Sequence, residues 1–279
     1  MTVVPSVPAP AVQIPAVPVD AVMPASAQLV ATVAIGVCCL AAMALALVRA
    51  RGTRGLAPPA LLIGGALAVV NEPVLNLLGG LWHARHGQWT LFEIFDRPMP
   101  VWAAGGYALF FGAVPLAILE VLRRRPTRGA FYRTIAVIMA ADLAIELPVV
   151  GSGMYVYYGY QPFILFGILP AEWLFINGLG PAATAVLLHR CPGLAGGPRW
   201  PVALVIPAVT QYAAWSIGIP FFSAFNGGAS HLGLWLAAGV TMALGLGGFV
   251  GLGRLLPTAE PGAPSPVEAA TPSSVPVHR

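Results

Sequence analysis

The stretch LLIGGALAVVNEPVLNLLGGL, residues 61–81, decides the fold. It is as long and apolar as an α-helix that crosses a bilayer, which takes about 20 residues. Within this run, however, Glu72 is followed by Pro73 and flanked by the amides of Asn71 and Asn76. An acid in such a run is costly to insert unless it is paired, protonated or in contact with water. The stretch therefore predicts a membrane span that carries a functional polar group.

The rest of the chain has the same apolar character. Of its 279 residues, 58% are hydrophobic and 9% are charged, whereas a soluble domain carries roughly 25% charged residues. This composition excludes an ordinary soluble protein and predicts a polytopic, multi-pass protein of the cell membrane. All 14 basic residues are arginines, which excludes Schiff-base chemistry. Because these arginines cluster in loops, the net charge of +4 does not indicate a nucleic-acid partner.

Seven apolar runs predict an all-α bundle of seven transmembrane helices. For the fifth helix the sequence leaves two starts open, one near residue 163 and one at Ala171, directly after Pro170. Residues 1–26 and 257–279 are rich in proline and are expected to be disordered tails around one membrane domain, residues 27–256. The predicted helices are about 27–49, 58–82, 100–122, 131–150, 163–189, 201–222 and 231–255.

The arginines lie in alternate loops and so predict the orientation. The loops at 83–99 and 151–162 carry only Arg85 and Arg97. By the positive-inside rule, these two loops are external, the N-terminus is outside and the C-terminus is in the cytoplasm. The loops predicted to be cytoplasmic contain Arg49, Arg51, Arg54, Arg123, Arg124, Arg125, Arg128, Arg133, Arg190 and Arg199.

Four acids, Glu72, Asp142, Glu146 and Glu172, fall within or at the edge of the predicted spans. Asp142 and Glu146 are four residues apart, so they share one helix face. Structural ion pairs would need an arginine at the same depth, and the sequence places none there. We therefore expect the four acids to be catalytic groups of an internal cavity. At least one is expected to be protonated at neutral pH, because burial and like-charge repulsion both disfavour ionisation.

Polar and aromatic side chains are expected to line the same cavity and to bind substrate. Asn71 or Asn76 is expected to orient the Glu72 carboxyl group through a hydrogen bond. The tyrosines after the fourth helix can shield a cationic intermediate, and an interfacial aromatic belt explains them equally well. The predicted substrate-binding residues are Asn71, Asn76, Asn177, Gln211, Tyr212, Trp215, Tyr155, Tyr157, Tyr158 and Trp173.

The motif ADLAIELPVVGSGMYVYYG, residues 141–159, resembles the fourth-helix region of the actinobacterial spirocyclase-like membrane proteins, the avermectin spiroketal cyclase type. Those proteins also tend to have an acid followed by proline on the second helix, which Glu72-Pro73 matches, although the acid there is more often aspartate. In size and helix count the chain is similar to small seven-helix membrane terpene cyclases. Both resemblances imply acid-initiated ring closure of a lipophilic substrate without redox or nucleotide chemistry.

The sequence lacks the motifs of other membrane enzymes. It has no aspartate-rich diphosphate motif and no histidine-rich diiron set, and no third ligand accompanies His83 and His86. No metal or cofactor is therefore expected. The leading hypothesis is an integral membrane cyclase that protonates a terpenoid, prenylated or polyketide spiroketal precursor by general acid/base catalysis. The alternatives are a small proton-coupled transporter and a non-catalytic membrane partner protein. The expected partners are a lipophilic small molecule and membrane lipid.

Overall fold

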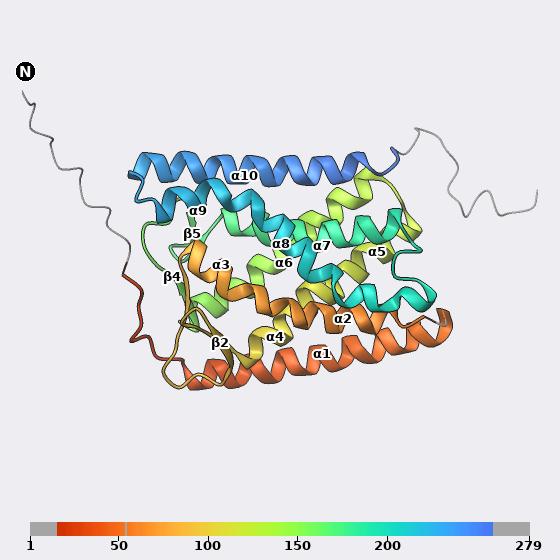
Figure 1. Ribbon diagram of the computed structural model, residues 1–279, viewed down its shortest axis with the longest axis horizontal. Coiled ribbons are helices and arrows are strands. Elements are labelled where there is room, and N and C mark those ends of the chain that lie inside the picture. The colour runs from red at the N-terminus through yellow and green to blue at the C-terminus, as the bar shows by residue number, and fades with distance from the viewer. Residues whose placement is uncertain (1–15, 54, 259–279) are drawn as a thin grey trace, which may run out of the picture.

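The computed structural model describes residues 16–53 and 55–258, which form a helical bundle (Figure 1). Residues 1–15 and 259–279, which make up most of the two predicted tails, lie outside the described residues. A sixth membrane span is obtained if Gly197–Leu204 and Ile206–Asn226, which are bent by 42° at their junction, are taken as one. Five continuous stretches are long and apolar enough to cross a membrane: Ala25–Gly52, Ala57–Gly79, Val101–Arg124, Arg128–Gly151 and His231–Arg254.

The helical elements follow the predicted ranges closely, and short strands occupy the loops between them. The helical elements are α1 (Ala25–Thr53), α2 (Ala57–Leu67), η1 (Ala68–Asn71), α3 (Glu72–Gly79), α4 (Val101–Tyr107), η2 (Ala108–Ala113), α5 (Val114–Arg124), α6 (Arg128–Gly151), α7 (Glu172–Arg190), η3 (Gly197–Leu204), α8 (Ile206–Trp215), η4 (Ser216–Gly218), α9 (Ile219–Asn226) and α10 (His231–Arg254). The strands are β1 (Leu81–His83), β2 (Thr90–Ile94), β3 (Arg97–Pro100), β4 (Tyr155–Tyr157), β5 (Ile164–Leu165) and β6 (Leu169–Pro170).

Two of the five membrane stretches are not regular α-helix along their whole length. The second predicted helix consists of α2, a 3₁₀ segment (η1) and α3, with Pro73 in the first turn of α3. The third consists of α4, a π-helical segment (η2) and α5. Proline lacks the N–H that would continue the hydrogen-bond ladder, and π-helical turns inside α-helices are frequent at functional sites. The breaks put Glu72 and Tyr107 at element boundaries.

The fifth helix begins later than the first of its two predicted starts. Residues from Ile164 to Pro170 form the β5–β6 hairpin instead of helix, and α7 begins at Glu172. This helix is less apolar than the five membrane stretches, and it is surrounded by protein: it packs against α5, α6, α8 and α10. Ile176, Ala182 and Ala185 on it are fully buried. A helix that contacts mainly other helices does not need a lipid-soluble surface.

Glycines allow α2 to approach two neighbours closely. A Cβ atom on Gly65 would lie 2.6 Å from the backbone nitrogen of Gly112 in η2, and one on Gly64 would lie 2.6 Å from the carbonyl oxygen of Ala203 in η3. Small residues at helix contacts are typical of membrane bundles, in which van der Waals packing replaces the hydrophobic effect. The glycines therefore hold α2 tightly between η2 and η3.

The strands form a cap at one end of the bundle (Figure 1). β1 pairs with β4, which joins the end of the second helical stretch to the end of the fourth. The prediction that these segments are plain loops missed this pairing. The described N-terminal segment also contacts the cap: Val22 forms a β-bridge with His86, and Met23 is buried.

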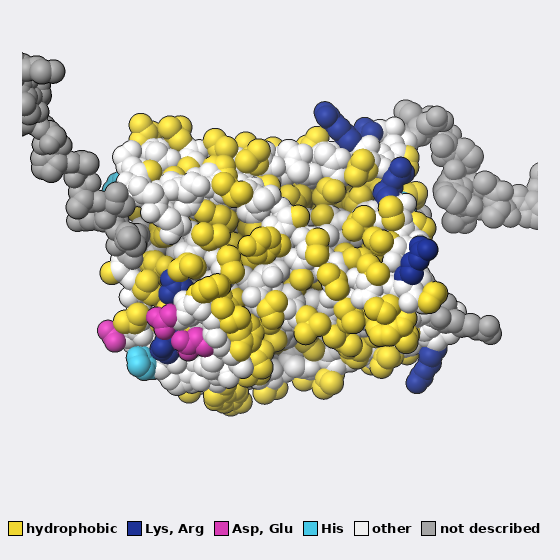
Figure 2. Space-filling model, viewed as in Figure 1, with side chains coloured by type: hydrophobic (Ala, Val, Ile, Leu, Met, Phe, Trp, Pro, Cys, Tyr) yellow, Lys and Arg dark blue, Asp and Glu magenta, His cyan; other side chains and the backbone are white. Residues whose placement is uncertain are grey.

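The side chains on the outer surface of the bundle are largely apolar. Figure 2 shows hydrophobic side chains over the middle of the molecule, arginines along the end opposite the cap, and acids grouped at the cap end. Leu40, Val137 and Leu232 are exposed to 73%, 68% and 69%. An apolar surface of this extent is expected where lipid is the solvent.

Candidate functional site

A cavity of about 430 Å³ lies inside the bundle next to the cap. Its volume falls within the range of about 300–1,000 Å³ typical of small-molecule sites. Elements between α1 and α7 form its walls: α1, α3, α4, η2, the first residue of α5, α6, α7 and the strands β1 and β4. Most of the lining is apolar, and the polar or hydrogen-bonding residues are Glu72, His83, Trp102, Tyr107, Asp142, Glu146, Tyr155, Tyr157, Trp173 and Asn177.

Glu72 is held in this cavity by a tyrosine. The Tyr107 hydroxyl donates a hydrogen bond to the Glu72 carboxyl group, which is 8% exposed. Tyr107 is the last residue of α4, directly before the π-helical segment η2. In that segment Leu109, Phe110 and Phe111 all line the cavity, although residues in a regular α-helix would point in directions 100° apart. The π-helical turn thus brings more side chains to the cavity.

The predicted orienting role of the two amides is wrong. Asn71 Nδ2 donates to Gln211 Oε1 on α8 at 3.1 Å, and Asn76 Nδ2 contacts His83 Nδ1 at 3.2 Å. Neither amide is bonded to Glu72. Asn71 therefore joins η1 to α8, and Asn76 joins α3 to β1 of the cap.

Two further acids enter the cavity from α6. Asp142 is 8% exposed, and its Oδ2 atom has no hydrogen-bond partner among the described residues. Glu146 Oε1 accepts a hydrogen bond from Asn177 Nδ2 on α7 at 3.4 Å, while its Oε2 atom has no such partner. Buried carboxyl oxygens without partners are rare, so these two atoms are available to a ligand.

No arginine lines the cavity among the residues that the structure describes. The three acids therefore lack the basic partner that a structural ion pair in a membrane requires. The only basic side chain in the lining is His83, which lies in β1, outside the membrane stretches. Burial lowers the pKa of His83 to about 3, so the imidazole is neutral at neutral pH.

Aromatic rings close the cavity on the side of the cap. The ring centroids of His83 lie 5.6 Å from Trp102 and 5.4 Å from Tyr155, and those of Tyr157 and Trp173 are 5.5 Å apart. Burial, followed by the charge of the nearby Glu146 carboxylate, raises the pKa of Tyr155 well above its usual range. Both cap tyrosines therefore stay as phenols that donate hydrogen bonds, and their π-faces can stabilise a cation.

The cavity opens toward the outer surface between α1 and α6. Ile145 on α6 lines it and is 65% exposed, and Cys38 on α1 also lines it and is exposed. α6 packs closely against α5, α7 and α10 and much less against α1. The opening therefore lies on the apolar flank of the bundle, away from the arginine end.

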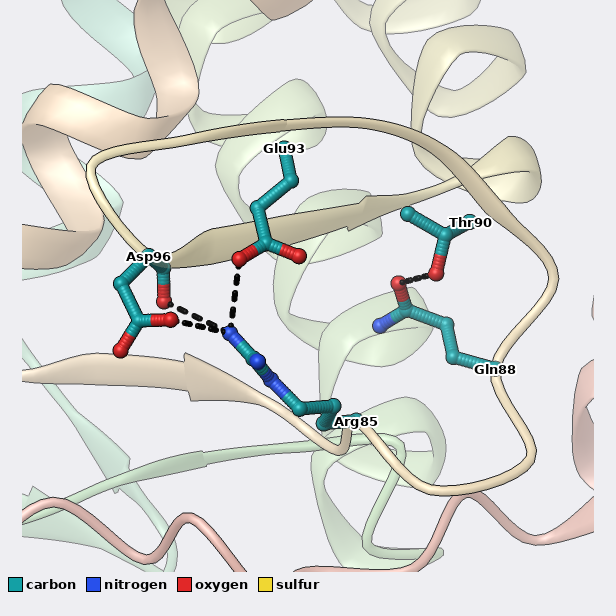
Figure 3. Close-up of polar contacts among 5 residues, drawn as sticks. All are labelled: Arg85, Gln88, Thr90, Glu93 and Asp96. Carbon is teal, nitrogen blue, oxygen red and sulfur yellow. Dashed lines mark hydrogen bonds and ion pairs between the residues drawn. The ribbon is translucent and has the colours of Figure 1, made fainter.

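The cap itself is held by a charged cluster away from the cavity. Arg85 Nη2 forms ion pairs with Glu93 at 2.9 Å and with Asp96 at 2.6 Å (Figure 3). Arg97 is 5% exposed, stacks over the Trp82 ring with 5.0 Å from Cζ to the centroid, and donates to the Tyr158 hydroxyl. These contacts fix the β2–β3 hairpin and Tyr158, and they explain why Tyr158 is not part of the lining.

Seven of the fourteen predicted site residues lie at the cavity, and seven do not. Glu172 is fully buried, and neither carboxyl oxygen has a hydrogen-bond partner among the described residues, but it does not line the cavity. Tyr212 is 53% exposed on the outside of α8. The residues brought together are Glu72, Asp142, Glu146, Asn177, Tyr155, Tyr157 and Trp173, and those outside the lining are Glu172, Asn71, Asn76, Gln211, Tyr212, Trp215 and Tyr158.

Three lining residues, Tyr107, His83 and Trp102, are not among the predicted site residues. Tyr107 carried a usable signal, because it is a lone hydroxyl inside an apolar run. His83 carried none, since it directly follows a predicted helix, where such residues are common. Only the pairing of β1 with β4 brings His83 beside Tyr155.

Comparison with known proteins gave no match: no family model, no curated protein and no solved structure is significantly similar to the chain. The resemblance to the spirocyclase-like family therefore stays a prediction that rests on the motif residues. Of these, Glu72, Asp142, Glu146, Tyr155 and Tyr157 all line the cavity.

Proposed function

We propose that the chain crosses the cell membrane seven times, with the N-terminus outside and the C-terminus in the cytoplasm. The seventh span is α7, the central helix that is shielded from lipid by its neighbours. In support, the described chain enters the bundle at the cap end and leaves it at the opposite end, as an odd number of crossings requires (Figure 1). Most of the arginines visible in Figure 2 lie at that second end, as the positive-inside rule expects for the cytoplasmic side, and Arg85 and Arg97 lie in the cap.

In this membrane the protein acts as a cyclase that closes a ring in a lipophilic natural-product substrate by general acid/base catalysis. One observation carries the proposal: three acids from two helical stretches converge, without an arginine, on a largely apolar cavity of about 430 Å³ that opens on the lipid-facing flank. A site for a soluble polar substrate would open at an end of the bundle and would present more hydrogen-bonding groups. A terpenoid or prenylated substrate, or a polyketide spiroketal precursor, fits this lining.

The acids divide naturally into a donor and an acceptor. Asp142 and Glu146 share one face of α6, and two adjacent carboxyl groups in an apolar site tend to hold one proton between them. One of this pair donates that proton to an alkene, epoxide or carbonyl group of the substrate. An internal π bond or hydroxyl then supplies the electron pair that closes the ring. Glu72, whose carboxylate is steadied by Tyr107, accepts the proton released from the cyclic cation.

The apolar and aromatic lining serves the cationic stage of the reaction. Tyr155, Tyr157 and Trp173 surround the cavity and present π-faces to a cation. Their burial excludes water, which would otherwise capture the cation before ring closure. The acid pair and the aromatic wall thus have complementary roles in one reaction class.

Membranes that contain the protein, incubated with a panel of prenylated and polyene substrates, test this function by mass spectrometry of the products. A cyclase gives an isomer of unchanged mass, or loss of water for a spiroketal. Glu72→Gln and Asp142→Asn are expected to abolish product formation. Glu172→Gln is the matched control, because it removes an equally buried acid outside the cavity. Full activity in both cavity variants would refute the site.

The transporter alternative makes a different prediction for the same protein. Purified into liposomes, a proton-coupled carrier would show pH-dependent flux of the compound with no change in its chemical structure. Flux without product, lost in Glu72→Gln and retained in Glu172→Gln, would favour the transporter over the cyclase.

A further inference from the structure

A second cavity lies at the arginine end of the bundle, opposite the end at which the acid cavity lies. Its volume is about 570 Å³, within the range of about 300–1,000 Å³ for ligand sites. The ends of α1, α5 and α7, the start of α2 and the segment between α7 and η3 form its walls. None of its lining residues is shared with the acid cavity. We call it the arginine groove.

Positive charge dominates the rim of the arginine groove. Three arginines, Arg49, Arg123 and Arg124, and one acid, Glu120, line it, which gives a formal balance of +2. Glu120 Oε1 accepts a hydrogen bond from Arg124 Nε at 2.8 Å. Arg49 comes from α1 and Arg123 from α5, so the charges approach the groove from two sides. Guanidinium groups in such an arrangement match the oxygens of a phosphate group.

The floor of the arginine groove is apolar. Leu116 on α5 and Leu188 on α7, which are half-buried, offer apolar surface to the groove, and the buried Leu61 and Leu119 lie beneath them. Leu61, Leu116 and Leu188 belong to one packed cluster with Ala195 and Ala203. A free phosphate ion gains nothing from a leucine floor. An amphiphile, in contrast, can place its charged group at the rim and its hydrocarbon on the leucines.

The groove also lies where lipid headgroups lie. The arginines mark the end of the apolar belt (Figure 2), and helix ends at this level meet the interface of a bilayer. Basic pockets between membrane helices on the cytoplasmic side bind anionic lipid headgroups. From this combination of position, charge and floor, we propose that the arginine groove binds one anionic phospholipid. Its phosphate contacts Arg49 and Arg123, and its acyl chain lies along the leucine floor.

This site depends on the bundle lying in a membrane and not on the chemistry proposed for the acid cavity. A lipid seated there would bridge α1 to α5 and α7. Arginines that only set the topology would bind such a lipid no better than any other basic residue nearby. If the groove binds a lipid, removal of a groove arginine weakens lipid binding more than removal of a nearby arginine outside it. If the arginines only set the topology, the two removals have the same effect on lipid binding.

The test uses the full-length protein in a neutral detergent. Phosphatidylglycerol and phosphatidylcholine are added separately, and bound lipid is counted by native mass spectrometry. Arg49→Gln with Arg123→Gln removes the rim charges. Arg51→Gln with Arg125→Gln is the matched control: both positions are exposed, both lie at the same ends of α1 and α5, and neither lines the groove. A third arm adds inorganic phosphate as competitor.

The native protein is expected to retain one phosphatidylglycerol in preference to phosphatidylcholine. Each rim arginine is expected to contribute about fivefold, so the rim pair loses about 25-fold in affinity and the control pair less than about twofold. Equal losses in both pairs, or no lipid preference in the native protein, would overturn the proposal. Competition by inorganic phosphate as strong as that by the lipid would show that the ligand is a soluble phosphate. If the rim pair does not fold, Arg123→Gln alone, an exposed position, is compared with Arg125→Gln, and equal affinities refute the site.

Discussion

The buried histidine of the cap gives the sharpest quantitative prediction. His83 is 4% exposed and lies in β1, and its hydrogen-bond and ring contacts within the described part of the chain are with neutral groups: the Asn76 amide and the rings of Trp102 and Tyr155. Burial lowers its pKa from 6.5 to about 3. Mild acid should therefore weaken the fold through this residue.

The sign and size follow from proton linkage. Because the folded pKa is lower than the unfolded one, the unfolded chain binds more protons between pH 3 and pH 6.5. The contribution of His83 to stability is complete above pH 6.5 and falls as the pH decreases toward 3. At 1.36 kcal/mol per pH unit, lowering the pH from 6.5 to about 5 costs about 2 kcal/mol. For a chain of this size that is roughly 4–8 °C in Tm.

Thermal unfolding of the detergent-solubilised protein, followed by tryptophan fluorescence at about pH 7.5 and about pH 5, measures this loss. His83→Gln is the comparison, since its amide oxygen can still accept a hydrogen bond from Asn76 but does not titrate. The native protein is expected to lose about 4–8 °C more than the variant on acidification. The cavity acids are present in both proteins, so their effects cancel in the difference. The same loss in both proteins would refute the assignment of a buried, neutral histidine.

Three other substitutions test particular contacts. Tyr107→Phe removes the hydroxyl that donates a hydrogen bond to Glu72. The rate of cyclisation is expected to fall about tenfold or more, because hydrogen bonds to charged groups contribute about 1.5–3 kcal/mol. Gly65→Ala puts a Cβ atom 2.6 Å from the Gly112 nitrogen, and unfolding measurements should show that the free energy of unfolding falls by about 1–3 kcal/mol. Gly36→Ala is the control: a Cβ atom there has nothing within 4 Å, so the substitution should be neutral or stabilising. Arg85→Gln removes two exposed ion pairs and should change stability by less than about 1 kcal/mol; a larger loss would mean that the cap depends on them.

The helical framework could be predicted from composition and hydropathy because each span satisfies its own backbone hydrogen bonds and is apolar along its length. The breaks in the second and third helical stretches could be predicted from the sequence only in part. Pro73 marked the start of α3, but no residue in the run 108–113 signals the π-helical segment η2. The hairpin formed by Ile164–Leu165 and Leu169–Pro170 is not distinguishable from helix in the sequence, because a short apolar run has no periodicity that separates helix from strand.

The acids of the site could be predicted for a related reason: a carboxyl group in an apolar helix is too costly to be incidental. That argument fixes residue type and depth but not the side of the helix. Glu172 passes the same test as Glu72, yet it lies outside the cavity. The amides gave a weaker signal, because an intramembrane amide is equally useful for holding elements together: Asn71 bonds to α8, and Asn76 contacts His83 in β1.

By itself, the sequence determined that this protein is built of apolar helices, that its arginines gather at one end, and that a few acids interrupt the helices. These properties follow from the free energy of transferring each residue between water and lipid, which depends on the residue and its neighbours in the chain. Only the tertiary structure decided which acids face one another, that Tyr107 bonds to Glu72, and that a basic groove forms at the arginine end. Those features depend on helix rotation and close approach, which are set by contacts such as Gly65 against Gly112, between residues far apart in sequence.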